Sequence, residues 1–355
     1  MKWLKTGQKR EDPSSLYEFT KRSLDKGYKF SDFPEDLRKE MQSVLKYPDH
    51  SYYFAIKLLK LGKEIPNEII QSISKDSTFS YNLVMKLREL GKEIPNELMQ
   101  SILEDPYYHG LFLLKTGKEI PEDIIQSISK SSAWSCSIAR ELLRLGKEIP
   151  NELIQSISEN SDLSYIFIEE LLRLGEEIPN ELIQSISEDP YYYGLFLLKT
   201  GKDIPEDIIQ SISEDPAQSC SFAIELRESG KNVPKEIMQS ILEDLDEVYR
   251  FAEELLKLGK DIKDIPNEII QKISEDSEYS HYFAIELLKR GKGIPNEIIR
   301  SIAESPEWSF EFSRTLKFDK SKIPPEIQES AKKWKDYKGE FEKQGSLSVR
   351  SKWLK

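Results

Sequence analysis

The sequence predicts an all-α fold, a right-handed α-solenoid of about ten two-helix repeats, each 26–32 residues long, with capping ends. The phrase LLKLGKEIPNEIIQSIS, residues 58–74, returns in close copies along the 355-residue chain. Glycine and proline alternate at a usual period of 29 residues, and the apolar residues between them follow helical spacing. A fixed period of this length is typical of stacked repeat proteins.

The first helix of each repeat, helix A, is expected to begin at the recurring proline. Proline suits the first helical position because its φ is already helical and the N–H it lacks would have no partner there. In the copy that starts at Pro66, Ile69, Ile70 and Ile73 lie on one face of the helix. Glu68, in the first turn, complements the positive end of the helix dipole.

The second helix, helix B, is expected to start after a serine cap and to end at the recurring glycine, which adopts the left-handed conformation without strain. Two shortened repeats contain EDPYYHG and EDPYYYG instead, so Asp105 and Asp189 are the expected caps there, followed by Pro106 and Pro190. In the other repeats the expected caps are Ser51, Ser80, Ser135, Ser164, Ser219, Ser280 and Ser309.

The chain is expected to divide into three parts. Residues 1–30 form an N-terminal cap helix, residues 31–325 the repeat array, and residues 326–355 a C-terminal helix with a basic tail. Within the array, residues 92–175 and 176–259 align without a gap, which indicates an internal duplication. A single hairpin of this size cannot bury both of its apolar faces, so each repeat is expected to complete its core against its neighbours.

Positions that repeat between copies identify the core of helix B. Counting back from the closing glycine, the fourth residue is leucine in all nine copies from Gly62 to Gly291, and the eighth is nearly always large and apolar. The seventh is small or β-branched, as at Ala55 and Gly110, which lets neighbouring helices approach closely.

Positions that vary between copies identify a surface. In the copy that ends at Gly62, Tyr53, Lys57 and Lys60 share a narrow wedge of the helix outside its apolar arc, so we expect them to face solvent. Their variation either presents a distinct binding surface at each repeat or reflects neutral drift. The candidate binding residues of this exposed wedge are Tyr53, Asn82, Tyr108, Phe112, Ile166, Tyr192, Phe196, Arg250 and Tyr282.

The two shortened repeats place pairs of aromatic residues on this wedge, Tyr108 with Phe112 and Tyr192 with Phe196. Tyrosine is enriched at interaction hot spots, so we predict that these pairs contact a partner. The alternative is that the three-residue deletion tilts these helices and buries the rings.

Helix A carries a glutamine at the same place in most copies, away from its isoleucine face. Because an amide both donates and accepts hydrogen bonds, a ladder of amides is able to bind the backbone of an extended peptide. The alternative is that each glutamine bonds the adjacent repeat or its loop. The candidate ladder consists of Gln71, Gln100, Gln126, Gln155, Gln184, Gln210, Gln239 and Gln271.

The formal charge of −12 is spread unevenly along the chain. Residues 1–30 contribute +4 and residues 331–355 contribute +5, which leaves −21 for the middle. We expect this acidic middle part of the chain to repel the phosphates of nucleic acids and to favour a partner with a basic surface.

No pattern in the sequence indicates catalysis, a cofactor or a metal site. The motifs G-x-S-x-G and H-E-x-x-H do not occur, and the three histidines are scattered. Cys136 and Cys220 occupy equivalent places in two copies, so they are expected to be buried thiols and not disulfide partners. With no apolar run long enough for a membrane span and no apolar centre near its start, the chain is expected to be soluble and cytoplasmic.

The repeats resemble the tandem helical-hairpin proteins of the armadillo, HEAT and ankyrin class, and more closely the uncharacterised short helical repeats of bacterial and viral proteins. The resemblance covers roughly residues 15–330. The sequence lacks the ankyrin TPLH and the tetratricopeptide WxxLG motifs, so the binding residues of those families cannot be carried over. What the resemblance implies is a binding scaffold.

The resulting hypothesis is a non-enzymatic protein-binding scaffold that uses the repeat surface and has a partner with a basic surface. Two alternatives stay open. The acidic array could mimic nucleic acid and inhibit a nucleic-acid-binding complex, such as a host-defence complex opposed by a viral protein. The exposed tyrosines could instead stack on the bases of RNA or DNA.

Overall fold

A computed structural model describes residues 47–316 and 323–344 of the chain. Within these two ranges it contains twenty α-helices, one short 3-10 helix and no strand. The chain is therefore an all-α protein built from tandem helical repeats, an α-solenoid, as its sequence predicts. The expected cap helix at residues 1–30 and the last residues of the basic tail, from 345 onward, lie outside the described residues.

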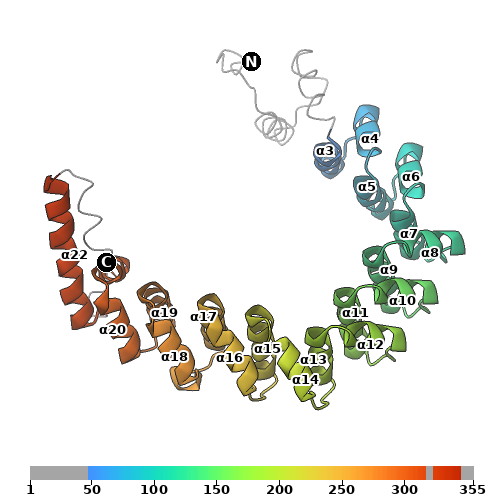
Figure 1. Ribbon diagram of the computed structural model, residues 1–355. Coiled ribbons are helices and arrows are strands. Elements are labelled where there is room, and N and C mark those ends of the chain that lie inside the picture. Colours follow the sequence, from blue (N-terminus) through green and yellow to red (C-terminus); the bar gives the residue numbers. More distant parts are fainter. Residues whose placement is uncertain (1–46, 317–322, 345–355) are drawn as a thin grey trace, which may run out of the picture. The chain divides into compact units, whose positions relative to one another are not determined.

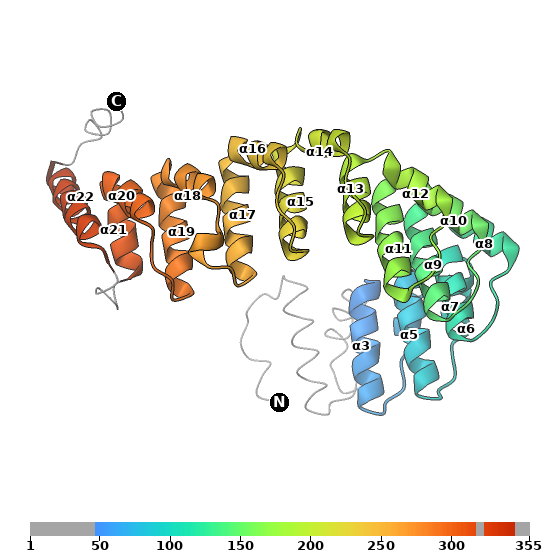
Figure 2. The ribbon, with the colours of Figure 1, turned by 90° about the horizontal axis from the view of Figure 1, so that it is seen from below.

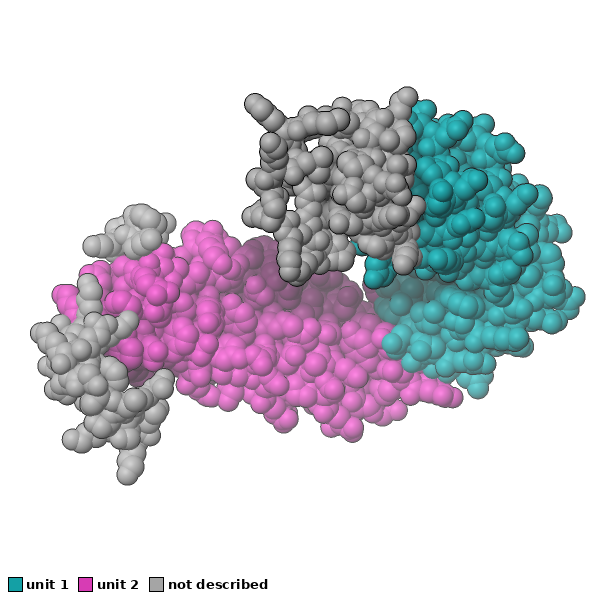
Figure 3. Space-filling model, turned by 90° about the horizontal axis from the view of Figure 1, so that it is seen from above, with its two compact units in different colours: residues 1–185 teal, residues 186–355 magenta. Residues whose placement is uncertain are grey.

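The chain forms two compact units, residues 1–185 and 186–355 (Figure 3). In the first unit the B helices are α3 (Pro48–Lys60), α5 (Ser77–Glu89), α7 (Pro106–Lys115), α9 (Ser132–Arg144) and α11 (Ser161–Leu174). The A helices are α4 (Asn67–Ile73), α6 (Asn96–Leu103), α8 (Glu122–Ile128) and α10 (Asn151–Ser158). One further A helix, α12 (Asn180–Ser187), contains the boundary between the units.

In the second unit the B helices are α13 (Pro190–Lys199), α15 (Pro216–Glu228), α17 (Leu245–Lys257), α19 (Ser277–Lys289) and α21 (Pro306–Thr315). The A helices are α14 (Glu206–Ile212), α16 (Lys235–Glu243), α18 (Asn267–Ser274), α20 (Asn296–Glu304) and α22 (Pro325–Gln344). The 3-10 helix η2 (Ile262–Asp264) forms in the connection that the sequence lengthens by three residues, and Asp261 caps it.

Each unit has two layers, one of B helices and one of A helices (Figure 1). From α3 to α9 and from α13 to α19, every B helix packs against the A helix that follows it and against the next B helix. Figure 2 shows α15, α17 and α19 side by side in the B layer of the second unit. The core lies between the layers and is shared by neighbouring repeats.

The core columns predicted from the repeats are confirmed. Eight of the nine leucines four residues before a closing glycine are buried, and Leu113 is half-buried. All nine residues at the seventh position are buried. At Gly194 an added Cβ would lie 2.9 Å from Ile212 Cδ1 and 3.2 Å from the ring of Phe222, so glycine permits the close approach of α13 to its neighbours.

The prolines lie one position earlier in the helix than expected. Pro66 is the N-cap of α4, with extended backbone at φ −60° and ψ 146°, and the helix itself begins at Asn67. The A helices from α6 to α20 whose caps are described start in the same way. The φ of proline suits both positions, so the sequence pattern alone does not separate them.

The predicted serine caps of the B helices are wrong. The cap lies four residues earlier and is most often an aspartate, as at Asp76, whose carboxylate accepts hydrogen bonds from the N–H groups of Thr78 and Phe79 at 2.9 and 3.2 Å. In the shortened repeats Asp105 and Asp189 cap α7 and α13 as predicted.

The serines expected as caps are instead buried inside the B helices. Ser80 donates to the carbonyl of Ile73, at the end of the preceding A helix, at 3.2 Å. It also bonds Ser101 Oγ, on the next A helix, at 3.0 Å. One hydroxyl thus joins three helices of two adjacent repeats. The bond to the preceding A helix recurs, at 2.7–3.5 Å, for Ser135, Ser164, Ser219, Ser280 and Ser309.

The glycine ends of the B helices are confirmed. Nine closing glycines have φ between 62° and 76°, in the left-handed region. The N–H that follows each glycine donates to the carbonyl of the core leucine, as from Lys63 to Leu58 at 2.9 Å. The same leucine therefore fills the core and fixes the direction in which the chain leaves the helix.

The left-handed cap can be tested with two glycines of one connection. Gly291→Ala is expected to lower the free energy of unfolding by about 1–2 kcal/mol, because alanine is strained at φ 70°. Gly293, which also has open space around it but is not left-handed, is the matched control. Gly293→Ala should cause no loss. Urea denaturation followed by circular dichroism measures both, and equal losses would contradict the cap.

The buried serine bond can be tested at Ser280. Ser280→Ala is expected to lower the free energy of unfolding by about 1–3 kcal/mol, because the carbonyl of Ile273 and the hydroxyl of Ser301 each lose a buried partner. Ser274→Ala, which removes a local bond to the Gln271 carbonyl near solvent, should change it by less than about 0.5 kcal/mol. Similar effects in chemical denaturation would show that the buried bond does not stabilise the repeat.

Candidate binding surface

The predicted wedge residues differ in exposure. Asn82, Tyr53, Ile166 and Tyr282 are exposed, whereas Tyr108, Phe112, Tyr192 and Arg250 are half-buried. The expected exposure of Phe196 is wrong, since only 4% of this residue is accessible.

Phe196 belongs to a buried stretch of α13, since Leu195, Leu197 and Leu198 are buried as well. The close approach at the glycine does not explain this, because Gly110 allows the same approach in α7 and Phe112 is only half-buried. The ring of Tyr193 stacks at 6.3 Å from that of Phe196. Of the rings that the alternative expected to be buried, Phe196 is buried, and Tyr108, Phe112 and Tyr192 are half-buried.

Aromatic rings form two groups of ring contacts on the B helices of the first unit, and both groups have a member on α5. On α3 and α5, Tyr52 contacts Tyr53 and Phe79, with ring centroids 5.6 and 5.5 Å apart. On α5, α7 and α9, Tyr108 contacts Tyr81 at 5.5 Å, and Tyr107 contacts Tyr108 at 5.0 Å and Trp134 at 5.9 Å. We call this set the aromatic strip; it consists of Tyr52, Tyr53, Phe79, Tyr81, Tyr107, Tyr108 and Trp134.

The strip has exposed rings at both ends. Tyr53 on α3 is 56% exposed and Trp134 on α9 is 39% exposed, and the rings between them are half-buried. Held by ring contacts and by the core beneath, these side chains lose little further freedom when they are covered. The arrangement offers apolar ring faces together with hydroxyl groups, which suits binding of a protein segment.

Five of the seven strip residues were missed in the sequence, although the repeats contain the signal for three of them. Ten residues before the closing glycine, tyrosine recurs in six of nine copies, at Tyr52, Tyr81, Tyr107, Tyr165, Tyr191 and Tyr249. These side chains lie between repeats: the hydroxyl groups of Tyr107 and Ser137, on consecutive B helices, are 2.8 Å apart. Burial raises the pKa of Tyr52 and Tyr81, and that of Tyr249 to about 12.

Ion pairs join the outer faces of consecutive B helices. Lys115 on α7 pairs with Glu141 on α9, and Arg144 Nε lies 3.6 Å from Glu170 Oε1 on α11. A hydrogen bond from Arg173 lowers the pKa of Glu170. Such pairs near solvent contribute little stability each, but they hold the outer faces of adjacent B helices in register.

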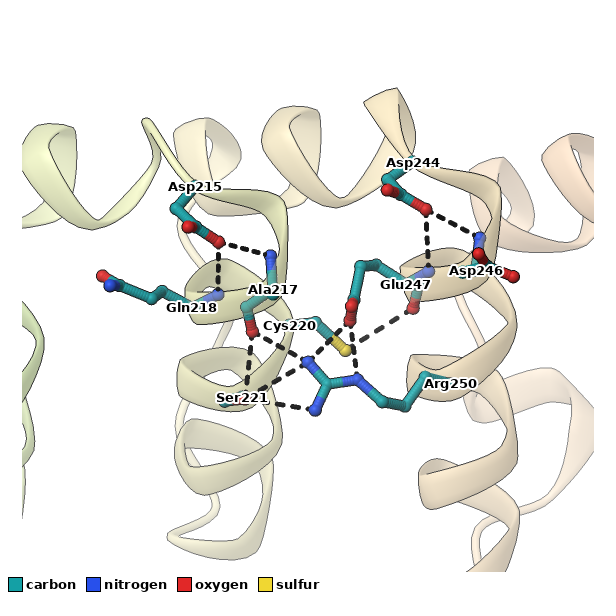
Figure 4. Close-up of polar contacts among 9 residues, drawn as sticks. All are labelled: Asp215, Ala217, Gln218, Cys220, Ser221, Asp244, Asp246, Glu247 and Arg250. Carbon is teal, nitrogen blue, oxygen red and sulfur yellow. Dashed lines mark hydrogen bonds and ion pairs between the residues drawn. The ribbon is translucent and has the colours of Figure 1, made fainter.

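Arg250 connects two repeats instead of standing free on the wedge (Figure 4). Its guanidinium donates to the Ala217 carbonyl at 2.8 Å and to Ser221 Oγ at 3.2 Å, both on α15, and to Glu247 on its own helix at 2.6 Å. The thiol of Cys220 donates to the Glu247 carbonyl at 3.5 Å. This network accounts for the arginine at a position where the duplicated sequence has Ile166.

All eight glutamines of the candidate ladder are exposed on the A helices. Gln100 donates to Glu104 and Gln126 to Glu122, each at 3.3 Å within one helix. At these two positions the amide bonds its own helix and not the adjacent repeat. Peptide binding by the ladder stays a prediction.

The described residues were also searched for a metal site and for a helix that could span a membrane. No group of three or more His, Cys, Asp and Glu side chains there is placed to hold a metal ion. Across residues 47–316 and 323–344, no helix combines the length and the apolar character that a membrane span requires. Two grooves of 490 and 500 Å³ lie between glycine–proline connections of the first unit, at Gly146 and at Lys63. They occupy equivalent places in different repeats and follow from the stacking.

Comparisons with known proteins identify no family. No family model matches the chain, and no curated protein matches it. Among solved structures, one described as "Circular tandem repeat protein with novel repeat topology and enhanced subunit contact surfaces" is similar over 94% of this chain and 73% of its own length. Its identity is 13% and its TM-score 0.16, which is too low to support an argument.

The helices and their repeated contacts define the class without that comparison: this is a tandem helical-repeat protein. Proteins of this class stack units whose outer faces form extended surfaces, and binding is their usual role.

The thiols of Cys136 and Cys220 are expected to react slowly with iodoacetamide in the folded protein. Burial raises the pKa of both thiols, that of Cys220 to about 12, so less of the reactive thiolate is present at about pH 8. Denaturation should restore the ordinary rate. Mass spectrometry counts the labels, and rapid labelling of the native protein would contradict their burial in α9 and α15.

Proposed function

We propose that the protein is a non-enzymatic scaffold that binds a segment of another protein across the aromatic strip. The observation that carries the proposal is the run of aromatic contacts over α3, α5, α7 and α9, with Tyr53 and Trp134 exposed at its ends. Monomeric proteins rarely leave contiguous apolar surface uncovered unless it has a binding role.

The position of the strip supports the same proposal. It lies on consecutive B helices, so its rings belong to separate repeats and each step of the stack adds a new contact. Tyr52, Tyr81 and Tyr107 belong to a column that recurs between repeats, whereas Tyr53, Tyr108 and Trp134 stand at places that vary between copies. The strip recurs only in part elsewhere: the place of Tyr53 and Tyr108 is taken by Ser221 on α15.

Composition alone favours a partner with a basic surface. That prediction concerns the acidic surfaces of the chain and remains untested. It does not extend to the strip, whose surroundings have a different charge.

The proposal is tested by selecting peptides from a random display library against the full chain. Selected peptides should lose at least about tenfold in affinity, about 1.4 kcal/mol, when the strip is truncated in the double variant Tyr53→Ala/Trp134→Ala, because central aromatic rings dominate such interfaces. Fluorescence anisotropy with labelled peptide measures this loss.

A matched control removes apolar surface outside the strip. Leu145 and Leu174 are 46% and 43% exposed, and the variant Leu145→Ala/Leu174→Ala should bind the same peptides as the wild type does. If the two double variants bind equally well, the strip is not the binding surface.

A further inference from the structure

Charge is divided between the two layers of the first unit. The A helices α4, α6, α8 and α10 carry formal charges of −1, −1, −2 and −1. The B helices α3, α5, α7 and α9 carry +1 each, whereas α11, the last B helix of this unit, carries −2. The strip therefore lies on positively charged helices, although the chain as a whole has a charge of −12.

The cations lie on the same helix faces as the rings. On α3, Lys57 and Lys60 follow Tyr53 by four and seven residues, the spacing of one helical face. Of the six equivalent places on the next three helices, three carry a cation, and the other three carry Glu89, Phe112 and Glu141. We call this set the basic row; it consists of Lys57, Lys60, Lys86, Lys115 and Arg144.

In the second unit α13 still carries +1, but the B helices that follow it are negative. There α15, α17, α19 and α21 carry −1, −2, −1 and −1. The place of Lys57 and Lys86 is taken by Glu225, Glu254 and Glu286 there, and already by Glu141 and Glu170 on α9 and α11. Net positive charge and the aromatic strip thus coincide on α3, α5, α7 and α9 and are not a general property of the repeat.

We propose that the segment bound by the aromatic strip is acidic. This inference rests on the proposed function and specifies the chemistry of its partner: aromatic or aliphatic side chains cover the rings, and carboxylates lie over the basic row. Charges of opposite sign across an interface steer association and suppress wrong partners. Four helices spaced about 8–10 Å apart span roughly 25–30 Å, the length of about eight or nine extended residues.

The charges near the row favour a protein segment over single-stranded nucleic acid. The Nζ atom of Lys86 lies 2.6 Å from Oε2 of Glu89, and Lys115 forms an ion pair with Glu141. A nucleic acid carries a phosphate at every nucleotide, so it would also place charge beside the aspartate caps Asp76 and Asp105. A peptide is able to place its few carboxylates over the row alone.

The test uses three fluorescein-labelled dodecapeptides with the same tyrosine and proline content, which carry four glutamates, four lysines or four serines. The full chain is expected to bind the glutamate peptide at least tenfold more tightly than the lysine peptide, with the serine peptide between them. Raising the ionic strength should weaken binding of the glutamate peptide and reduce the difference in affinity between the glutamate and lysine peptides. Equal affinities, or tighter binding of the lysine peptide, would overturn the proposal.

Variants with reversed charges test whether the basic row causes the preference for the glutamate peptide. Lys60→Glu/Lys86→Glu should weaken binding of the glutamate peptide at least tenfold. The control Lys235→Glu/Lys263→Glu makes the same change in net charge at exposed lysines of the second unit, and should leave affinity within twofold. Circular dichroism establishes that both variants fold, and Lys60→Gln/Lys86→Gln, with an expected loss of severalfold, replaces the first if it does not. Equal losses in the variant and the control would overturn the proposal.

Two further outcomes separate this inference from the proposed function. If Tyr53→Ala/Trp134→Ala abolishes binding of a selected peptide while Lys60→Glu/Lys86→Glu has no effect, the strip binds protein but the acidic partner is wrong. If a twelve-nucleotide oligothymidine binds more tightly than the glutamate peptide and is lost from both variants, the ligand is nucleic acid, and both proposals fail.

Discussion

The constraint on which the structure depends is that a hairpin of 26–29 residues has too little apolar surface of its own to fold alone. Its neighbours supply the rest, and they must do so at the same places in every repeat. The leucine four residues before the closing glycine meets this requirement twice. At Leu287 the side chain is fully buried, and the carbonyl accepts the N–H of Lys292 at 2.9 Å, which sets the exit of the chain toward the next helix.

Buried polar groups reinforce this dependence between repeats. A serine hydroxyl inside a helix ordinarily bonds its own backbone, but Ser80 and its equivalents bond the A helix before them. Because these serines are fully buried, water does not compete for this bond. The positions that carry the stack are thereby fixed, and variation is confined to the outer faces of the helices.

The sequence predicts those features that depend only on residues within one repeat. Left-handed glycines, the aspartate caps of the shortened repeats and the buried columns all follow from local spacing. The serine caps failed because a residue that favours helix starts also serves as a buried donor, and the true cap, such as Asp76, lies one turn away. Exposure of the shortened repeats could not be predicted locally. The segment GLFLLKTG is identical at 110–117 and 194–201, yet Phe112 is half-buried and Phe196 is buried.

The net charge favours a basic partner, but much of the acidity has a structural origin. Nearly every A helix begins with a glutamate in its first turn, where the carboxylate stabilises the helix dipole. Because this glutamate recurs in repeat after repeat, the negative charges add up to a large total. The two layers are about a helix diameter apart, roughly 10 Å, which is close to the screening length of about 8 Å in physiological salt. A partner on the B layer therefore responds mainly to the charges of that layer, and these differ between the units.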